Sequence, residues 1–360
     1  MGTSTANVGL EGVVAFETEI AEPDKEGSAL RYRGVDIEEL AGAVPFERVW
    51  GLIVNESLDR GLPPTPDVAP ATRTGDARVD LQATIPTLAP KWGLKQLVDI
   101  DADQARDDLA RISAATLSIV AQALRGDAPP VPEDEVAKGK TAAEQFMIRW
   151  RGDLDEQQAK ALDVYWVSAA EHGMNASTFT ARVAASTGAD CAACIASAVG
   201  SLSGPLHGGA PARVLPMLDA VAEMGDADRY VHDLLGRGER IMGFGHRVYR
   251  AEDPRSRVLK RTARELGSPR VEAADALERA AIAALREKYP DRPLETNVEF
   301  WGAIVLELAE VPAAITPALF ACARTAGWSA HIVEQKRTGR LIRPSASYVG
   351  PAERPLSSLR

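Results

Sequence analysis

The sequence predicts a mainly α-helical fold with a small β hairpin near the N-terminus. Apolar residues recur at steps of three and four along most of the chain, which is the spacing of one buried helical face. Short β-branched or alternating runs are found near the N-terminus instead. With 360 residues, 45% hydrophobic and 26% charged, the chain has the composition of an ordinary globular protein of one large domain or two.

The predicted hairpin comes first along the chain. The runs "GVVAFETEI" (12–20) and "SALRYRGVDI" (28–37) are separated by the polar segment "AEPDKEG" (21–27), so we expect two strands joined by a loop. The segment that covers 58–80 is rich in Pro, Gly, Thr and Asp, and it predicts an exposed connection.

Two long helices are predicted with most clarity. Apolar residues repeat at helical spacing over 109–123 and again over 271–285. The second helix should stop at "KYPDRP", where two prolines prevent its continuation, and a Pro-rich loop over 125–140 separates helices earlier in the chain. Gly-rich "GPLHGGAP" at 204–211 and Pro312 are expected hinges on either side of a mobile subdomain.

Composition and charge exclude several classes of protein. The formal charge of -10 argues against a nucleic-acid partner and against an anionic membrane surface. No segment has the roughly 20 uninterrupted apolar residues of a membrane-spanning helix, and the N-terminus lacks the pattern of an export signal, so we expect a cytoplasmic protein. Cys191 and Cys194 form a C-x-x-C without a second ligand pair, which favours helical core packing over a metal site.

Three of the five histidines lie beside glycines or small residues: His172, His207 and His246. Glycine neighbours leave room for a ligand to reach an imidazole. The sequence "GFGHRVY" is not a dinucleotide-binding loop, because Val248 stands at the third glycine position and no strand precedes it. His232 lacks such neighbours and is expected to be structural or on the surface, as is His331.

Several arginines are candidates for binding small carboxylates, because a guanidinium forms bidentate hydrogen bonds with them. They are Arg255 in "DPR", Arg324 in "FACARTAGW" and Arg343 in "LIRPSASY". Arg324 lies in an apolar helix, so it needs an anionic partner, which is either a ligand or an internal Asp or Glu. Glu299 lies between hydrophobic and aromatic residues, which favours a raised pKa and a role as general base.

These segments together resemble the citrate synthase family. Nearly the whole chain resembles it, most weakly over about 59–100, and the motifs stand in the family's order and spacing: "EHGMNAST", "GPLHGGA", "GFGHRVYRAEDPR", "NVEFWGAIVLE" and "FACARTAGWSAHIVEQ" followed by "IRPSASYVG". The resemblance implies a two-domain, helical homodimer that closes on its substrate. By motif, the large domain is 1–208 with 313–360, and the small domain is 209–312.

The resemblance also implies roles for the catalytic residues. His207 would stabilise the enol of acetyl-CoA, and His246 would polarise the ketone of oxaloacetate and protonate the new alkoxide. Glu299 matches the position of the base that removes the methyl proton. No metal and no cofactor is implied, since acetyl-CoA is a substrate.

Substrate binding is assigned in the same way. Residues that match oxaloacetate ligands are His172, Arg255, Arg324 and Arg343, the last contributed across the dimer interface. Residues that match the CoA site are Arg250, Met242 and Gly243.

One position departs from the family pattern, because the base is normally aspartate and here it is Glu299. The extra methylene moves the carboxylate by about 1 Å or more, a displacement that can cost on the order of 100-fold in rate unless the backbone compensates. A 2-methylcitrate synthase that uses propionyl-CoA has the same catalytic residues and stays open as an alternative. A non-catalytic protein that binds oxaloacetate or CoA is the alternative of another class.

Overall fold

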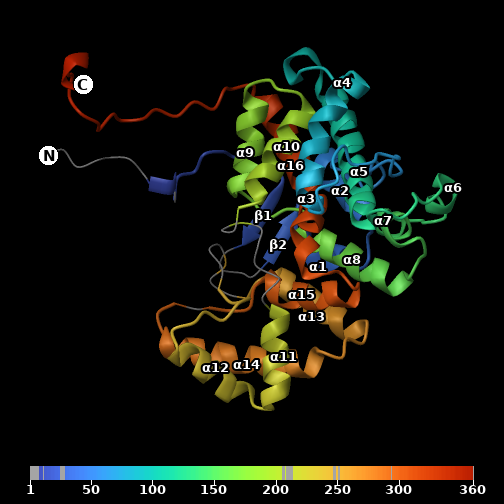
Figure 1. Ribbon diagram of the computed structural model, residues 1–360, viewed down its shortest axis with the longest axis vertical. Coiled ribbons are helices and arrows are strands. Elements are labelled where there is room, and N and C mark those ends of the chain that lie inside the picture. The colour runs from blue at the N-terminus through green and yellow to red at the C-terminus, as the bar shows by residue number, and fades with distance from the viewer. Residues whose placement is uncertain are drawn as a thin grey trace.

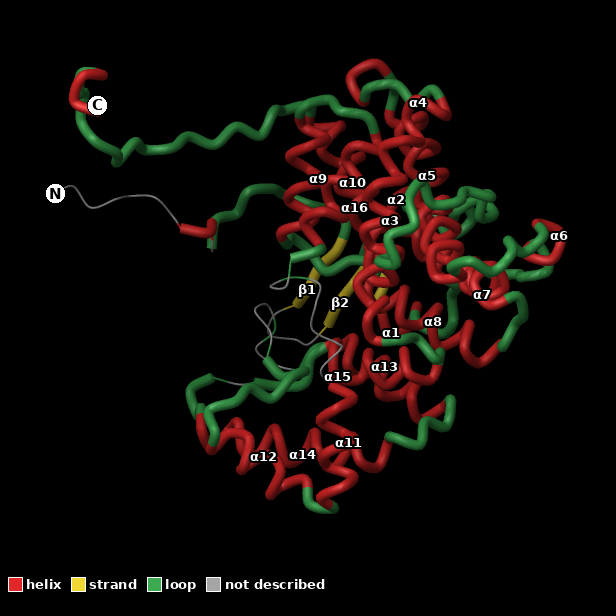
Figure 2. Tube along the Cα trace, viewed as in Figure 1, coloured by secondary structure: helices red, strands yellow, loops and turns green. Residues whose placement is uncertain are grey.

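The computed structural model of the protein describes residues 8–10, 12–24, 29–204, 207, 214–245, 249, 252–292 and 294–359. Helices make up most of this chain, and strands are confined to one small sheet (Figure 2). The predicted mainly α fold is therefore confirmed. None of the described helices is long and apolar enough to cross a membrane.

The small sheet is antiparallel and three-stranded, in the order β1 (Ala21–Asp24), β2 (Ala29–Tyr32) and β3 (Val35–Asp36). Ala21 lies opposite Tyr32, and Arg31 lies opposite Asp36. The expected first strand at 12–20 is wrong, because β1 forms within the segment expected to be a loop. Residues 13–18 have no strand partner, whereas Pro23 is tolerated because β1 is an edge strand.

The upper body of the molecule contains most of the helices (Figure 1). In chain order they are α1 (Ile37–Leu40), α2 (Phe46–Asn55), α3 (Ala77–Thr84), α4 (Leu88–Trp92), α5 (Ala102–Arg125), α6 (Glu133–Val136), α7 (Ala142–Arg151), α8 (Glu156–Ala169), α9 (Ala176–Ser186), α10 (Cys191–Leu202) and α16 (Thr316–Thr338). The helix predicted over 109–123 is confirmed as part of α5. Cys191 and Cys194 are buried in α10, as expected of core residues.

Helix α16 is the centre of this body, although it is the last α-helix of the chain. Its residues are buried almost without interruption from its first turn to Gln335, and it contacts α2, α5, α8, α9 and α10. A helix that is apolar on most sides is stable only when other elements surround it. It begins with Pro317 in its first turn and ends at Gly339, whose φ of 63° allows a left-handed cap.

The lower lobe is formed by α11 (Val214–Met224), α12 (Ala227–Gly236) and α14 (Val271–Lys288). Helices α13 (Pro254–Glu265) and α15 (Val298–Leu308) lie between this lobe and the upper body, where both contact α8. The prediction for 271–285 is confirmed as α14, which ends just before Pro290. The division at 208 and 312 stays a prediction.

The Pro-rich connection at 58–80 differs in part from expectation. Most of it is irregular, but Thr65 and Val68 are 6% and 4% exposed, and α3 begins at Ala77 behind the Asp76 cap. Burial of Thr65 is tolerated because its amide and hydroxyl both donate hydrogen bonds to Gln145 Oε1 of α7. Segments 12–18 and 340–359 extend from one side of the molecule (Figure 1).

Candidate active site

The first turn of α15 presents Glu299 and is held in place by the cap residue Asn297. Asn297 Oδ1 accepts a hydrogen bond from the Glu299 amide at 3.0 Å, and its Nδ2 donates to the Gly245 carbonyl at 2.9 Å. The Asn297 amide donates to the Gly243 carbonyl at 2.9 Å. Gly243 has φ 85°, and a Cβ there would lie 2.8 Å from Phe300 Cβ. The loop that leads to 246 is therefore fixed to the helix of the predicted base.

Asp253 joins α13 and α15 through one buried carboxylate. Its Oδ1 accepts from the Arg255 amide at 3.0 Å and from Arg255 Nε at 2.9 Å, while Oδ2 accepts from Arg255 Nη2 at 2.7 Å. The same Oδ2 accepts from the Val298 amide at 3.1 Å. Burial raises the pKa of Glu299; Arg255 opposes this increase and Asp253 adds to it. Sequence reasoning missed Asp253, although Asp before a proline is a typical helix N-cap.

Arg324 of α16 is 2% exposed and donates from Nε to the Ala169 carbonyl at 3.0 Å. Its guanidinium lies 4.7 Å from the centre of the Phe320 ring. Within the described part of the chain, no carboxylate lies within ion-pair distance of it, so the alternative of an internal ion pair is not supported. Burial lowers its pKa, the Glu171 charge opposes this, and nearby Arg255 lowers it further. Two guanidinium groups thus lie close together.

His207 is positioned by Ser177 in the first turn of α9. Its Nε2 lies 2.8 Å from Ser177 Oγ and accepts a long hydrogen bond of 3.4 Å from the Ser177 amide. Trp328 Nε1 donates to the same Oγ at 3.1 Å. With Nε2 assigned as the acceptor of the Ser177 amide bond, the proton of a neutral ring is on Nδ1. Burial and the charge of Arg324 lower the pKa of His207 to about 4, so the ring is neutral near pH 7.

The remaining predicted residues are placed unequally. His172 lies in the loop between α8 and α9, 8% exposed, with its ring edge-on to Tyr249 at 5.1 Å between centroids. Met242 is half-buried against the core. Arg343 lies in the exposed segment that follows α16, apart from the cluster. His246 and Arg250 lie outside the described residues.

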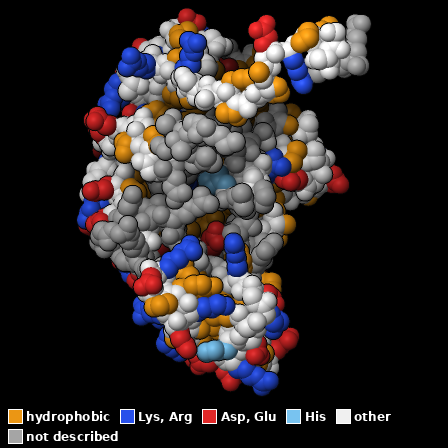
Figure 3. Space-filling view, turned by 90° about the vertical axis from the view of Figure 1, so that its left-hand side faces the viewer, with side chains coloured by type: hydrophobic (Ala, Val, Ile, Leu, Met, Phe, Trp, Pro, Cys, Tyr) orange, Lys and Arg blue, Asp and Glu red, His pale blue; other side chains and the backbone are white. Residues whose placement is uncertain are grey.

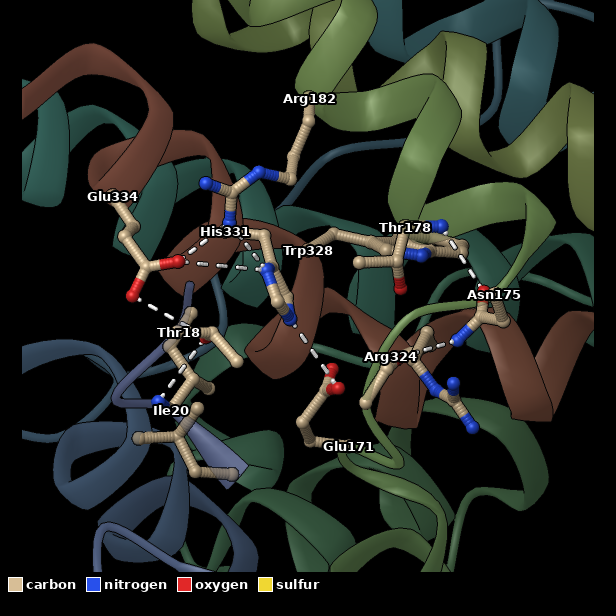
Figure 4. A network of polar contacts seen from close by, with 12 residues as sticks. Thr18, Ile20, Glu171, Asn175, Thr178, Arg182, Arg324, Trp328, His331 and Glu334 are labelled. Atoms are coloured by element: carbon tan, nitrogen blue, oxygen red, sulfur yellow. Dashed lines mark hydrogen bonds and ion pairs between the residues drawn. The ribbon is translucent and has the colours of Figure 1, made fainter. Parts of the chain in front are cut away.

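A buried ionic network surrounds His331 (Figure 4). Glu171 Oε1 lies 3.4 Å from His331 Nε2, and His331 Nδ1 lies 2.9 Å from Arg182 Nη1, which also contacts Glu334. Because a guanidinium only donates, Nδ1 accepts and Nε2 donates to Glu171. Gly327 is required beside it, since a Cβ there would lie 1.8 Å from Glu171 Oε2. His331 is thus structural, as expected from its sequence setting.

Comparison with known proteins identifies relatives along nearly the whole chain. The family model for the citrate synthase C-terminal domain matches residues 9–345. A Mycobacterium tuberculosis protein described, provisionally, as citrate synthase 2 is 60% identical, with 96% of this chain and 93% of that protein covered. A 2-methylcitrate synthase of Shewanella oneidensis is 32% identical over 96% of this chain and 95% of its own length.

Solved structures have the same architecture. The citrate synthase of the thermophilic archaeon Thermoplasma acidophilum, in a ternary complex with carboxymethyl coenzyme A and oxaloacetate, superposes with a TM-score of 0.81 at 28% identity. The match covers 99% of this chain and 100% of that chain. A citrate synthase from Pyrobaculum aerophilum superposes with a TM-score of 0.80, also at 28% identity, over 98% of this chain and 95% of its own.

Proposed function

The chain belongs to the citrate synthase family, and we propose that it condenses acetyl-CoA with oxaloacetate and hydrolyses citryl-CoA to citrate and CoA. Enzymes of this family transfer an acyl group from CoA to oxaloacetate. The identity of the acyl group is the part that we propose. The proposal includes the roles of individual residues and the arrangement of two copies as a dimer.

The observation that carries the proposal is the environment of Arg324. A buried guanidinium whose only described hydrogen-bond acceptor is a backbone carbonyl is costly unless a ligand neutralises it. Arg255 lies near it, with part of its charge balanced by Asp253. Oxaloacetate is a dianion, so its two carboxylates offset the charge of this pair and satisfy the fixed guanidinium donors.

Glu299 and His207 supply the proton chemistry. Glu299, with a raised pKa, removes a proton from the thioester methyl group, and neutral His207 donates a hydrogen bond from Nδ1 to the thioester oxygen as negative charge develops there. The methyl carbon then forms a bond with the ketone carbon of oxaloacetate. Titratable groups whose environments shift their pKa values in opposite directions are typical of assigned acid and base roles.

The remaining steps involve residues whose roles the family resemblance implies. His246 protonates the alkoxide that the new bond leaves on the former ketone, and water then cleaves the thioester of citryl-CoA to release the free thiol of CoA. Arg343 binds a carboxylate in the partner subunit's site. Exposed apolar side chains near the chain ends support contact with a second copy, among them Val14, Tyr348 and Val349, 79% to 87% exposed.

CoA carries phosphates that need cationic partners. Figure 3 shows Lys and Arg side chains gathered on the lower lobe, beside the area drawn in grey. The family resemblance implies that CoA binds at Met242 and Gly243, with Arg250 as a further cation. In a protein with a formal charge of -10, a local group of Lys and Arg side chains supplies the positive potential that attracts an anionic ligand.

The test is oxaloacetate-dependent release of CoA thiol from the purified protein, with acetyl-CoA and propionyl-CoA compared side by side. We expect a higher kcat/KM with acetyl-CoA. A propionyl preference would assign a 2-methylcitrate synthase, the activity named for the Shewanella oneidensis relative. No thiol release with either thioester, together with oxaloacetate binding, would leave a non-catalytic binding protein.

Glu299→Asp tests whether the site has adapted to the longer base. We expect kcat to fall, because the Asn297 cap and the packing of Gly243 against Phe300 fix the backbone for a glutamate. A large gain in kcat would show instead that the native carboxylate is misplaced. Glu299→Gln is the control, since it keeps the size and abolishes the base.

A further inference from the structure

Tyr165 of α8 lies where that helix meets the three helices of the candidate site. Helix α8 contacts α13, α15 and α16, which bear Arg255, Glu299 and Arg324. Tyr165 is 4% exposed, and its ring edge lies 3.5 Å from the position that a Cβ of Gly302 would occupy. Gly302 stands one turn after Glu299, so the ring packs on the face of α15 that bears the base.

The surroundings of the phenol are charged on several sides. Burial raises its pKa, the Glu299 carboxylate raises it further, and Arg324 and Arg255 oppose the increase. The phenol is therefore protonated near pH 7, and its hydroxyl is available as a hydrogen-bond donor. Neighbouring guanidinium groups cannot accept that proton, because they have only donors.

The hydroxyl of Tyr165 makes no hydrogen bond with the residues that the structure describes. Tyr32 is also buried near Arg255 and Arg324, but its hydroxyl is hydrogen-bonded within the protein. It lies 3.0 Å from the Val167 carbonyl oxygen and 3.1 Å from the Glu171 carbonyl oxygen. A phenol hydroxyl that has no protein partner, in a site with two guanidinium groups, is available to donate to a ligand acceptor.

We propose that Tyr165 is an additional oxaloacetate-binding residue, whose hydroxyl donates a hydrogen bond to a substrate carboxylate held between Arg324 and Arg255. This inference rests on the proposed function and deepens it. A carboxylate bound by the guanidinium groups has further lone pairs, and the phenol is a donor of fixed direction beside them. Glu299 is the other nearby acceptor, but the structure has no hydrogen bond between it and Tyr165.

The experiment is Tyr165→Phe, which removes one oxygen and keeps the ring on Gly302. Titration calorimetry with oxaloacetate alone should show binding weakened about tenfold or more, the usual effect of losing one hydrogen bond to a charged group. The KM for oxaloacetate should rise in parallel. The KM for the thioester should stay within about twofold of the wild type. The pH at which kcat falls on the acid side should not move, because Glu299 is unchanged.

Tyr32→Phe is the control, since its hydroxyl is already used within the protein. We expect it to lower the melting temperature more than Tyr165→Phe does, with a smaller effect on oxaloacetate affinity. The proposal is overturned if Tyr165→Phe leaves oxaloacetate affinity unchanged, or if its main effect is a shifted acid limb of kcat, which would place the hydroxyl on Glu299. If the wild-type protein binds oxaloacetate but releases no thiol, the proposed function is wrong. The role of Tyr165 is still tested in that case, because calorimetry compares the oxaloacetate affinity of the wild type with that of Tyr165→Phe.

Discussion

Two buried arginines in the upper body differ in how their charge is balanced. Arg182 is 1% exposed and contacts Glu334, His331 and Gln335. Arg324 is equally buried, yet its described partners are one backbone carbonyl and the face of Phe320. Burial alone therefore does not distinguish a structural arginine from one whose charge is available to a ligand. The distinction is whether a carboxylate of the protein lies within ion-pair distance.

The same contrast extends to the neighbours of each arginine. Arg182 makes its hydrogen bonds within the protein. The network also holds the N-terminal segment, since Glu334 Oε1 accepts from Thr18 Oγ1 and the Glu19 amide. Around Arg324 lie Tyr165 and His207, whose remaining donors have no described acceptor. The first region stabilises the fold, and the second retains the hydrogen-bonding capacity that the proposed ligand would use.

Arg182→Met should produce the largest effect on stability. It leaves Glu334 buried without its cation and His331 without the donor that fixes its tautomer. Removing one partner of a buried ion pair costs about 3–5 kcal/mol, to be measured by urea unfolding. Arg182→Lys should recover part of the loss, because it restores the charge without the second donor direction. A change below about 1 kcal/mol would contradict the assignment of this region.

Arg324→Met should change oxaloacetate affinity much more than stability. The free energy of unfolding should fall by no more than about 1 kcal/mol, the value of its hydrogen bond to Ala169, because no described carboxylate is left unpaired. Oxaloacetate affinity should fall about 100-fold or more, since a charged hydrogen-bonded pair with the ligand is lost. Urea unfolding measures the stability, and titration calorimetry on the folded variant measures the affinity. A stability loss equal to that of Arg182→Met would show that the two arginines do not differ in role.

His331→Asn is a smaller change to the structural region. The shorter side chain can still accept from Arg182, but it cannot reach Glu171, whose Oε1 loses its donor. We expect a loss of about 1–3 kcal/mol, the cost of an unsatisfied buried group, with oxaloacetate affinity changed less than by Arg324→Met. Urea unfolding and calorimetry test this prediction, which an unchanged midpoint would contradict.

The last prediction concerns the pH dependence of stability. His207 has a pKa of about 4 in the folded protein against 6.5 for the ordinary side chain, so the unfolded chain binds more protons between these values. The free energy of unfolding should therefore fall as pH decreases from 6.5 to 4. His207→Gln should flatten this part of the curve relative to wild type, as followed by thermal unfolding across that range. If the free energy of unfolding depends on pH in the same way in both proteins, the pKa of His207 is not lowered in the folded state.

Much of the fold was predictable because helical spacing and proline stops are local signals. They located α5 and α14 and the end of α14 before Pro290. The first strand was not predictable in this way, because β1 contains the polar residues Glu22 and Asp24 and exists only through its pairing with β2. The apolar run at 12–20 lacks such a partner.

The candidate site was predictable where a residue type is conspicuous in its sequence setting, as with Glu299 and Arg324. Asp253, Ser177 and Tyr165 were missed, because their importance depends on contacts between segments far apart in the chain. Asp253 reaches the amide of Val298, and Ser177 orients His207, and neither distance is encoded in a local pattern. The roles of all the candidate residues stay predictions, and His246 and Arg250 also lie outside the described residues.

The central position of α16 has a consequence for synthesis. The chain leaves the ribosome from its N-terminus, so α2, α5, α8, α9 and α10 are complete about a hundred residues before the helix that fills the space between them. During that interval their apolar faces are open to solvent and to chaperones. Folding of the upper body therefore finishes only near the end of translation, and a fragment that stops before Thr316 would lack the central helix of its core.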